Sequence, residues 1–308
     1  MPIFGAVSQP AGAIRYGRRP VFVDYLIVAG GGGSGGAYNS GWSRAGGGGA
    51  GGVLSSERSG SSQLEFFKDD VVTVTVGGGG AARNIVSPPP LGGDSVFGSL
   101  TALGGGCGTY GRNVSGGAGA YQNYQGSSGG SGGGGNAGGS YTSGYSGTPG
   151  QGNDGGDMSG GGGGANQAGS NRSSSTVGGK GGDGLGISFV PASFQTLTGA
   201  GRTHTDGIVY FGGGGAGGGG SPTRALGGGA TGSGAYSGSP GAAKCGGGAS
   251  GADASGKFGS NGGSGVVIIR YLTALSTPTI GAGLTYQSAT DGDYTLVAFT
   301  GGSDTVTF

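Results

Sequence analysis

The chain has 308 residues, of which 91 are glycine, while only 9% are charged and the net charge at pH 7 is +1. This near-neutral balance gives no electrostatic basis for binding nucleic acid or an anionic membrane. No apolar stretch approaches the roughly 18 residues of a membrane-spanning helix, so we expect neither nucleic acid binding nor membrane insertion.

A short basic arm is expected at the start of the chain. Residues 1–22 contain Arg15, Arg18 and Arg19, which are candidates for docking onto another protein. The pair Arg18-Arg19 precedes an apolar run, as in a twin-arginine export signal. That run is short, contains Asp24 and ends in four glycines instead of a cleavage site. We therefore interpret it as the first strand of the folded domain.

This first strand, VFVDYLIVA (21–29), leads into glycines with the G-x-G-x-x-G spacing of a dinucleotide site, at Gly30, Gly32 and Gly35. Glu57 follows at about the place of a ribose-binding acid. Such a site needs a helix directly after the glycines, because helix N–H groups bind the pyrophosphate. The glycine-rich residues that follow cannot form one, at a cost of about 1 kcal/mol per glycine. We expect no dinucleotide cofactor.

Further apolar blocks are rich in β-branched and aromatic residues and predict β-strands. They are VVTVTV (71–76), GISFV (186–190), GIVYF (207–211), GVVIIRYL (265–272), YTLVAF (294–299) and DTVTF (304–308). Ala29, Val76 and Phe211 each run straight into GGGG. A flexible linker has no reason to repeat that junction, so we expect a folded chain.

The glycine runs themselves fit neither helices nor sheets. They can adopt the polyproline II path, with 3 residues per turn and no internal hydrogen bonds, so that buried N–H and C=O groups must pair with neighbouring segments. Ordering a glycine costs about 1–2 kcal/mol, while a hydrogen bond returns about 1 kcal/mol. We therefore predict that the runs are ordered, extended and hydrogen-bonded to one another as a lattice.

The chain divides into three parts in this interpretation. Residues 1–22 are the docking arm, residues 23–272 form a glycine-rich domain whose opening and closing strands pair with each other, and residues 273–308 form a C-terminal β-hairpin tail. In that tail we expect the strands YTLVAF and DTVTF to be joined by a turn around Gly301-Gly302.

The order of these pieces resembles the glycine-rich domain of tailed-phage tail-fibre and adhesin proteins. The resemblance covers Asp24 to Tyr271, and the closing GGSGVVIIRY (262–271) is its most distinctive part. In distal adhesins of T-even-like phages, glycine helices stack as a polyglycine II sandwich, and loops at its tip bind the host receptor. The implied fold is mostly irregular and β: a bundle of polyglycine II helices flanked by short strands, with little or no α-helix.

Catalytic chemistry is sparse. His204 stands beside Asp206 in GRTHTDG, where a turn is the simpler interpretation because no nucleophile lies in a recognisable motif. Cys107 and Cys245 border glycine runs and are either small fillers of the lattice or a disulfide. Two cysteines and a single histidine do not make a metal site. We expect no catalytic residue, no metal site and no cofactor.

Two further segments match ligand-binding motifs only in part, and a turn is the simpler interpretation of the first. GNDGGD (152–157) offers carboxylates without the twelve-residue loop of a calcium site. GADASGKF (251–258) has Phe258 where a phosphate-binding loop needs Ser or Thr.

An aromatic cluster is the most informative feature for function. Tyrosines set among Ser, Gly and Asn are typical of binding surfaces, because they combine rigid contacts with adaptable hydrogen bonding. Alternatively, these rings cover the glycine lattice, which has no side chains of its own. The candidate receptor-binding residues are Tyr121, Tyr124, Tyr141, Tyr145, Tyr38 and Trp42.

The resemblance therefore implies a non-enzymatic phage virion protein, located in the virion and serving as a tail-fibre or host-attachment subunit. Its expected partners are other tail or fibre proteins and a host cell-surface glycan or protein. The alternative is a purely structural fibre or decoration protein without receptor binding. The sequence leaves open whether several copies of the chain assemble.

Overall fold

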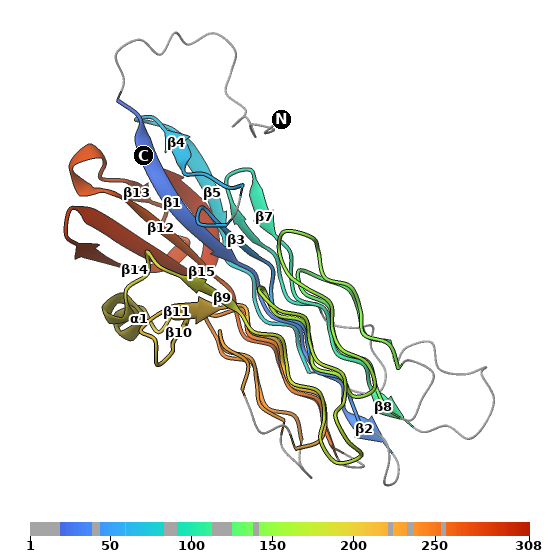
Figure 1. The fold of residues 1–308 in the computed structure, drawn as a ribbon. Helices are drawn as coiled ribbons and strands as arrows, with labels where there is room; N and C mark the ends of the chain where they lie inside the picture. The colour runs from blue at the N-terminus through green and yellow to red at the C-terminus, as the bar shows by residue number, and fades with distance from the viewer. Residues whose placement is uncertain are drawn as a thin grey trace.

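A computed structural model describes residues 19–38, 44–58, 60–82, 91–112, 125–137, 142–220, 224–232, 237–253 and 257–308. The molecule is elongated, with a β-sheet body at one end and a bundle of extended glycine-rich segments at the other (Figure 1). Within the described ranges, helix is confined to α1 (Ala192–Thr198) and the 3-10 turn η2 (Thr273–Leu275). The expectation of a mostly β and irregular fold with little helix is confirmed. Neither helical segment is long and apolar enough to cross a membrane.

Ten strands of the described residues form the main sheet, in the order β3-β1-β12-β15-β5-β6-β7, with β4 on β1 and with β13 and β14 on β15. These strands are β1 (Val21–Val28), β3 (Val53–Ser55), β4 (Leu64–Phe66), β5 (Val71–Thr75), β6 (Ser95–Phe97), β7 (Leu100–Ala102), β12 (Val266–Leu272), β13 (Thr279–Ile280), β14 (Leu284–Asp291) and β15 (Tyr294–Thr307). A smaller sheet joins β9 (Leu185–Ile187), β10 (Arg202–Thr203) and β11 (Val209–Phe211), and a third pairs β2 (Ala37–Tyr38) with β8 (Gly111–Arg112).

The centre of the main sheet is buried on both faces. Strand β1 pairs antiparallel with β12 over Val23–Val28, which confirms that the strands opening and closing the glycine-rich domain pair with each other. Along β12, Ile269 points into one apolar cluster, with Phe97 and Phe299, while Ile268 points into a second cluster on the opposite face. Burial of both faces explains why these strands read as continuous apolar runs without alternation.

The C-terminal hairpin has its turn in a different place from the one we predicted. Its strands are β14 and β15, which pair from Asp291↔Tyr294 onwards around Gly292. Strand β15 continues through Gly301-Gly302, so the prediction of a turn there is wrong. After this glycine pair β15 leaves β12 and β14 and pairs with β5, and Gly302 has φ +95°. The two glycines bend this long strand, since glycine within a strand often marks a bend.

A second layer covers one face of the sheet through α1 and the small sheet. Helix α1 lies between Pro191 and Gly199, whose φ of +68° ends the helix in the left-handed conformation. Its Phe194 packs with Phe211 of β11 and Leu296 of β15 in the second apolar cluster.

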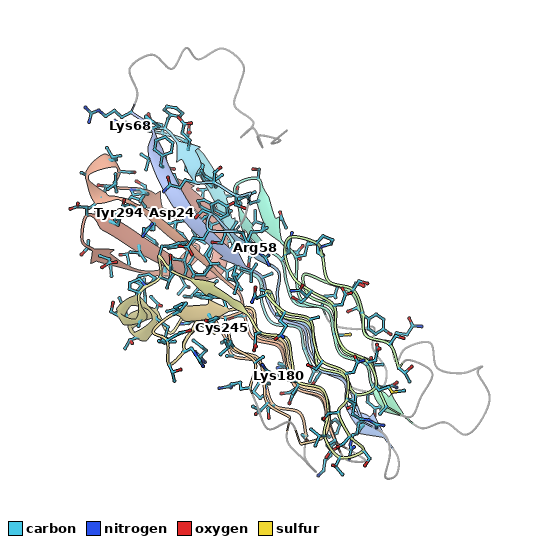
Figure 2. All side chains as sticks on the ribbon, viewed as in Figure 1. Asp24, Arg58, Lys68, Lys180, Cys245 and Tyr294 are labelled. Carbon is cyan, nitrogen blue, oxygen red and sulfur yellow. The ribbon has the colours of Figure 1, made fainter. Side chains whose placement is uncertain are left out.

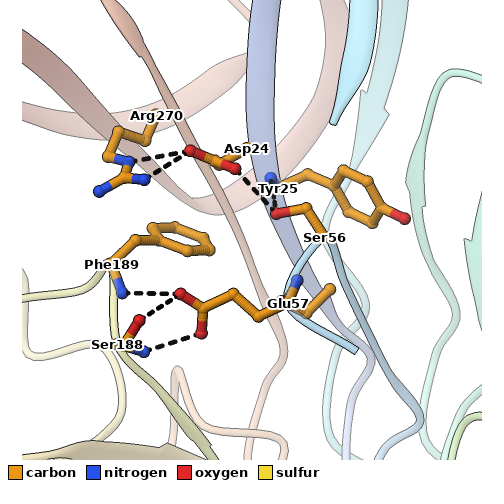
Figure 3. Close-up of polar contacts among 8 residues, drawn as sticks. Asp24, Tyr25, Ser56, Glu57, Ser188, Phe189 and Arg270 are labelled. Atoms are coloured by element: carbon orange, nitrogen blue, oxygen red, sulfur yellow. Dashed lines mark hydrogen bonds and ion pairs between the residues drawn. The ribbon is translucent and has the colours of Figure 1, made fainter. Parts of the chain in front are cut away.

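Polar contacts also attach this layer to the sheet (Figure 3). Glu57 accepts hydrogen bonds from the backbone N–H groups of Ser188 (2.9 Å) and Phe189 (3.1 Å). Within the main sheet, Arg270 forms a two-pronged ion pair with Asp24, directly opposite on β1, at 2.7 and 3.0 Å. The Arg270 guanidinium also lies over the Phe189 ring of the covering layer, 5.2 Å from its centroid. Glu57 is thus a structural anchor, and strand β2 follows directly after the Gly30–Gly35 spacing.

The glycine runs form a hydrogen-bonded lattice. In segment 45–52, every third residue donates its amide hydrogen to the same neighbouring segment, at N···O distances of 2.8–3.1 Å. Ala45, Gly48 and Gly51 donate to Ala252, Ala249 and Gly246; Gly46, Gly49 and Gly52 donate to Thr109, Gly106 and Leu103; Gly47 and Ala50 donate to Gly160 and Gly163. A three-residue repeat without internal bonds is the geometry of polyproline II, so the predicted polyglycine II bundle is confirmed.

The lattice is packed backbone against backbone. A Cβ atom at Gly48 would lie 2.2 Å from the carbonyl oxygen of Gly32, and one at Gly162 would lie 2.0 Å from that of Gly48. Real Cβ atoms essentially never approach this closely. Only glycine therefore fits at these positions, which explains the composition of the chain.

Candidate binding site at the tip of the glycine bundle

The far end of the bundle brings together five segments that are distant in the sequence. Strand β2 pairs in parallel with β8, Ala37 forms a bridge with Lys257, and Arg44 forms a bridge with Ala137. We call these residues, together with Asp253 and Phe258, the bundle tip: Ala37, Tyr38, Arg44, Gly111, Arg112, Ala137, Asp253, Lys257 and Phe258. Figure 1 shows β2 and β8 at the end of the molecule farthest from the C-terminus.

Backbone hydrogen bonds and one ion pair hold the tip together. Ala37 and Lys257 exchange both backbone bonds, at 2.9 and 3.2 Å, and Ala137 N–H donates to the Arg44 carbonyl at 3.1 Å. The Arg44 guanidinium pairs with Asp253 and also donates to the Ser175 carbonyl. Arg44 and Asp253 are both mostly buried. The tip is therefore fixed by contacts that link its segments directly.

The tip residues border the segments that contain most of the predicted aromatic site. Trp42 lies between Tyr38 and Arg44 in the sequence, Tyr121 and Tyr124 follow Arg112, and Tyr141 follows Ala137. Trp42, Tyr121, Tyr124 and Tyr141 themselves lie outside the described residues. Tyr38 is placed in β2 by its backbone. Each of these segments thus has at least one described end at the tip of the bundle.

Tyr145 is the predicted binding tyrosine whose side chain the structure describes, and it lies on the bundle flank. A Cβ at Gly126 would lie 2.7 Å from Tyr145 Cε2, so the ring covers that glycine. The Tyr145 backbone donates to the Gly133 carbonyl and accepts from Gly155 N–H, both at 2.9 Å. This geometry favours the covering role for Tyr145. Tyr110, only 4% exposed, covers Gly36 in a similar way.

Sequence reasoning missed one exposed residue at the tip. Phe258 is 65% exposed, and the neighbouring Lys257 is also exposed. An exposed aromatic ring beside a cation is a common binding element, since such rings carry contact area at low entropic cost. The sequence did contain a signal for this residue, because Phe258 is a bulky aromatic residue within a Gly- and Ser-rich segment.

The opposite end of the molecule carries the described part of the basic arm. Arg19 lines a pocket of about 300 Å³ together with Lys68, Leu275 and Phe308. Phe308 is fixed there, because Asp69 N–H donates to its carbonyl at 2.7 Å and its own N–H donates to Asp70 at 3.0 Å. Figure 2 shows Lys68 at this end and Lys180 on the bundle. Arg15 and Arg18 lie outside the described residues.

The other polar residues considered from the sequence, Asp206, Asp154 and Asp157, accept hydrogen bonds that stabilise local backbone structure. Asp206 accepts hydrogen bonds from Ile208 N–H and the Tyr210 hydroxyl, which with His204 lower the pKa of its carboxyl, within an exposed turn. Asp154 and Asp157 accept backbone N–H bonds from Gly147 and Gly144, both at 2.8 Å. Among the described residues no cluster of His, Cys, Asp or Glu is suited to a metal ion.

Both cysteines are buried thiols and do not form a disulfide. Cys245 packs against Gly228, where an added Cβ would lie 2.9 Å from the Cys245 Cβ. Desolvation raises the pKa of the Cys245 thiol to about 11. This surrounding agrees with the filler interpretation, since an inert buried thiol acts as a small apolar side chain.

A family model described as a glycine-rich domain matches residues 9–272. No curated protein is found to be similar to the chain.

Proposed function

The chain belongs to the glycine-rich domain family, and from this premise and the arrangement of its two ends we propose that it is a tailed-phage virion protein, a tail-fibre or host-attachment subunit without enzymatic activity. The sheet end, which carries Arg19, docks onto other tail or fibre proteins, together with Arg15 and Arg18 of the basic arm. The bundle tip contacts a glycan or protein of the host cell surface.

One observation supports this proposal most strongly. The segments that hold Trp42, Tyr121, Tyr124 and Tyr141 each have at least one described end at the bundle tip, through β2–β8 and two β-bridges; these ends are Tyr38, Arg44, Arg112 and Ala137. The segments concerned are rich in Tyr, Ser, Gly and Asn, which is the composition of adaptable binding surfaces. This arrangement supports a binding surface built from separate parts of the sequence at one end of the scaffold.

The lattice gives that end a rigid support. Each glycine segment at the tip is bonded to several neighbours, as the three directions of segment 45–52 illustrate. Binding groups are held best when the element beneath them cannot move independently. The tip residues Lys257 and Phe258 add an exposed cation and ring to the proposed contact surface.

A purely structural virion protein is the second candidate, and the covering tyrosines favour it. Tyr110 and Tyr145 both pack over glycines of the bundle, so tyrosine in this chain also serves the lattice. If all the tyrosines did so, the bundle would act as a stiff spacer without a receptor.

Binding of the labelled protein to intact bacteria and to an array of bacterial surface glycans tests the proposal. Replacing Tyr121, Tyr124 and Tyr141 by Ala is expected to weaken binding at least tenfold, as loss of aromatic hot spots does (about 1.4 kcal/mol or more), and to leave the melting temperature unchanged. Phe258→Ala is expected to weaken binding less. Phe22→Ala, a 50% exposed ring on β1, is the control at the other end.

Three outcomes would contradict the proposal. Unchanged binding by the triple variant would remove the tip from attachment, and an equal loss with Phe22→Ala would indicate non-specific adhesion. Gold-labelled antibody on purified virions should mark the tail, and particles that remain unlabelled would refute the virion assignment.

A further inference from the structure

Strand β14 (Leu284–Asp291) is a long uncovered edge of the main sheet. It pairs with β15 on one side, and within the described residues no strand pairs with its other side. Six of its eight residues are exposed, with Ala289 half-buried and Leu284 buried. Edges of this length are normally shortened, charged or covered in proteins that stay monomeric.

The two ends of the sheet order, by contrast, are short and bridged to each other. Strands β3 and β7, the two ends of the sheet order, have only three residues each. Gln151 bridges them, because its carbonyl accepts from Val53 N–H at 3.0 Å and its side-chain amide donates to the Thr101 carbonyl at 3.1 Å. Gly52 N–H also donates to Leu103 at 2.8 Å. The β3 and β7 edges are therefore joined by hydrogen bonds, whereas the outer edge of β14 has no pairing strand among the described residues.

The hairpin register identifies which backbone groups of β14 point outward. The two-residue turn closes on the pair Asp291↔Tyr294, which is a hydrogen-bonded pair in a hairpin of this length. Bonded and non-bonded pairs then alternate along the ladder. Asp291, Ala289 and Gln287 therefore bond to β15, while the N–H and C=O groups of Thr290, Ser288 and Tyr286 point away from the sheet.

We propose that β14 pairs antiparallel with β14 of a second copy of this chain, joining two main sheets about a two-fold axis at Ser288. In this register Ser288 faces Ser288 of the second copy and Tyr286 faces Thr290, an aromatic and β-branched pair of the kind that stabilises sheets.

In this register no like charges face each other. The one charged side chain of β14, Asp291, faces Thr285 of the second copy and not another carboxylate. The strand has no Lys, Arg or Pro, the residues that commonly block such edges. A self-complementary strand also meets the requirement of an isologous contact, in which each side presents the same patch. The proposal is independent of the attachment function.

Sedimentation velocity of the whole chain and of its variants tests the pairing. The wild type is expected to form a concentration-dependent dimer. Ser288→Lys and Ser288→Glu should each weaken dimerisation at least about tenfold, because like charges then face each other across the axis. Mixed in equal amounts, these two variants should form a heterodimer. Ser288→Pro, which removes the outward N–H group, should be monomeric and folded.

Matched controls keep the result interpretable. Ser288→Ala retains the backbone donor and should still dimerise, and so should Thr73→Lys, an equally exposed change on the internal strand β5. A wild-type chain that stays monomeric would overturn the proposal. So would Lys and Glu variants that dimerise alone, or that fail to associate when mixed, because each result places Ser288 away from a two-fold axis.

Discussion

Replacing a lattice glycine by alanine gives the most direct test of the glycine bundle. At Gly162 the added Cβ would lie 2.0 Å from the Gly48 carbonyl oxygen and 2.6 Å from Gly49 N. At Gly214 it would lie 2.1 Å from the Gly162 carbonyl oxygen. Every one of these neighbours is backbone, so no side chain can rotate away to make room.

The cost follows from how far the segments must separate. Ordinary contact begins at 3.4 Å, so at Gly162 the neighbouring segment must move by about 1.4 Å. Bonds such as Gly215 N–H to Gly48 (2.9 Å) and Gly162 N–H to Gly215 (2.8 Å) would then stretch beyond bonding distance. Overpacking costs about 1–3 kcal/mol and each lost bond about 1 kcal/mol. We expect Gly162→Ala and Gly214→Ala each to destabilise the fold by about 2–4 kcal/mol.

Gly78→Ala is the matched control, within another GGGG run. An added Cβ there meets nothing within 4 Å, and its φ lies outside the left-handed region. The change should be neutral or stabilise by up to about 1 kcal/mol, through reduced entropy of the unfolded chain. Urea unfolding of the three variants decides the matter. If Gly162→Ala and Gly214→Ala are as stable as Gly78→Ala, these glycines are not packed as the structure shows.

Three further predictions concern single side chains. Burial raises the pKa of Cys245 to about 11, above the value near 8.5 of an unfolded thiol. The buried neutral thiol therefore contributes stability that is present below about pH 8.5 and is lost as the pH rises towards 11, by about 3 kcal/mol. Urea unfolding across this pH range should show a smaller loss of stability for Cys245→Ala. Arg270→Met leaves the Asp24 carboxylate buried without its ion pair and should lower the free energy of unfolding by about 3 kcal/mol. Adding Asp24→Asn should restore much of that stability. If it does not, the loss comes from packing of the Arg270 side chain and not from the unpaired charge. Tyr145→Ala should lower the melting temperature, because its ring covers the lattice, whereas Tyr121→Ala should not; equal effects would contradict the separation of the two roles.

Local patterns were enough to predict the general architecture. The strand-to-GGGG junctions at Ala29 and Phe211 correctly indicated ordered glycine segments, since the strands continue into the bundle (Figure 1). The pairing of β1 with β12 followed from their position at the two ends of the glycine-rich domain. These features depend on residues adjacent in the sequence or on one long-range pairing.

Features that depend on several long-range contacts were not predicted. Gly301-Gly302 has the letters of a turn, but the pairing of β15 with β12, β14 and β5 carries the strand through it. Which segments neighbour one another in the lattice also could not be read, because all glycine runs are chemically alike. The position of the bundle-tip residues depends on this order of neighbours. The sequence could therefore identify the aromatic segments but could not show that their bordering residues lie at one end of the bundle.

The two halves of the molecule depend on each other energetically. Ordering each glycine costs about 1–2 kcal/mol and a hydrogen bond returns about 1 kcal/mol, so the bundle alone gains no surplus. The main sheet supplies the net stabilisation of the fold, at about 1.5–3 kcal/mol for each fully buried side chain such as Ile269. Because β1 and β11 run directly into the bundle at Ala29 and Phe211, folding of the sheet also fixes the ends of glycine segments and lowers the entropy lost when they pair. The position of the strand junctions, more than the number of glycines, therefore makes this chain fold where a linker of equal composition would not.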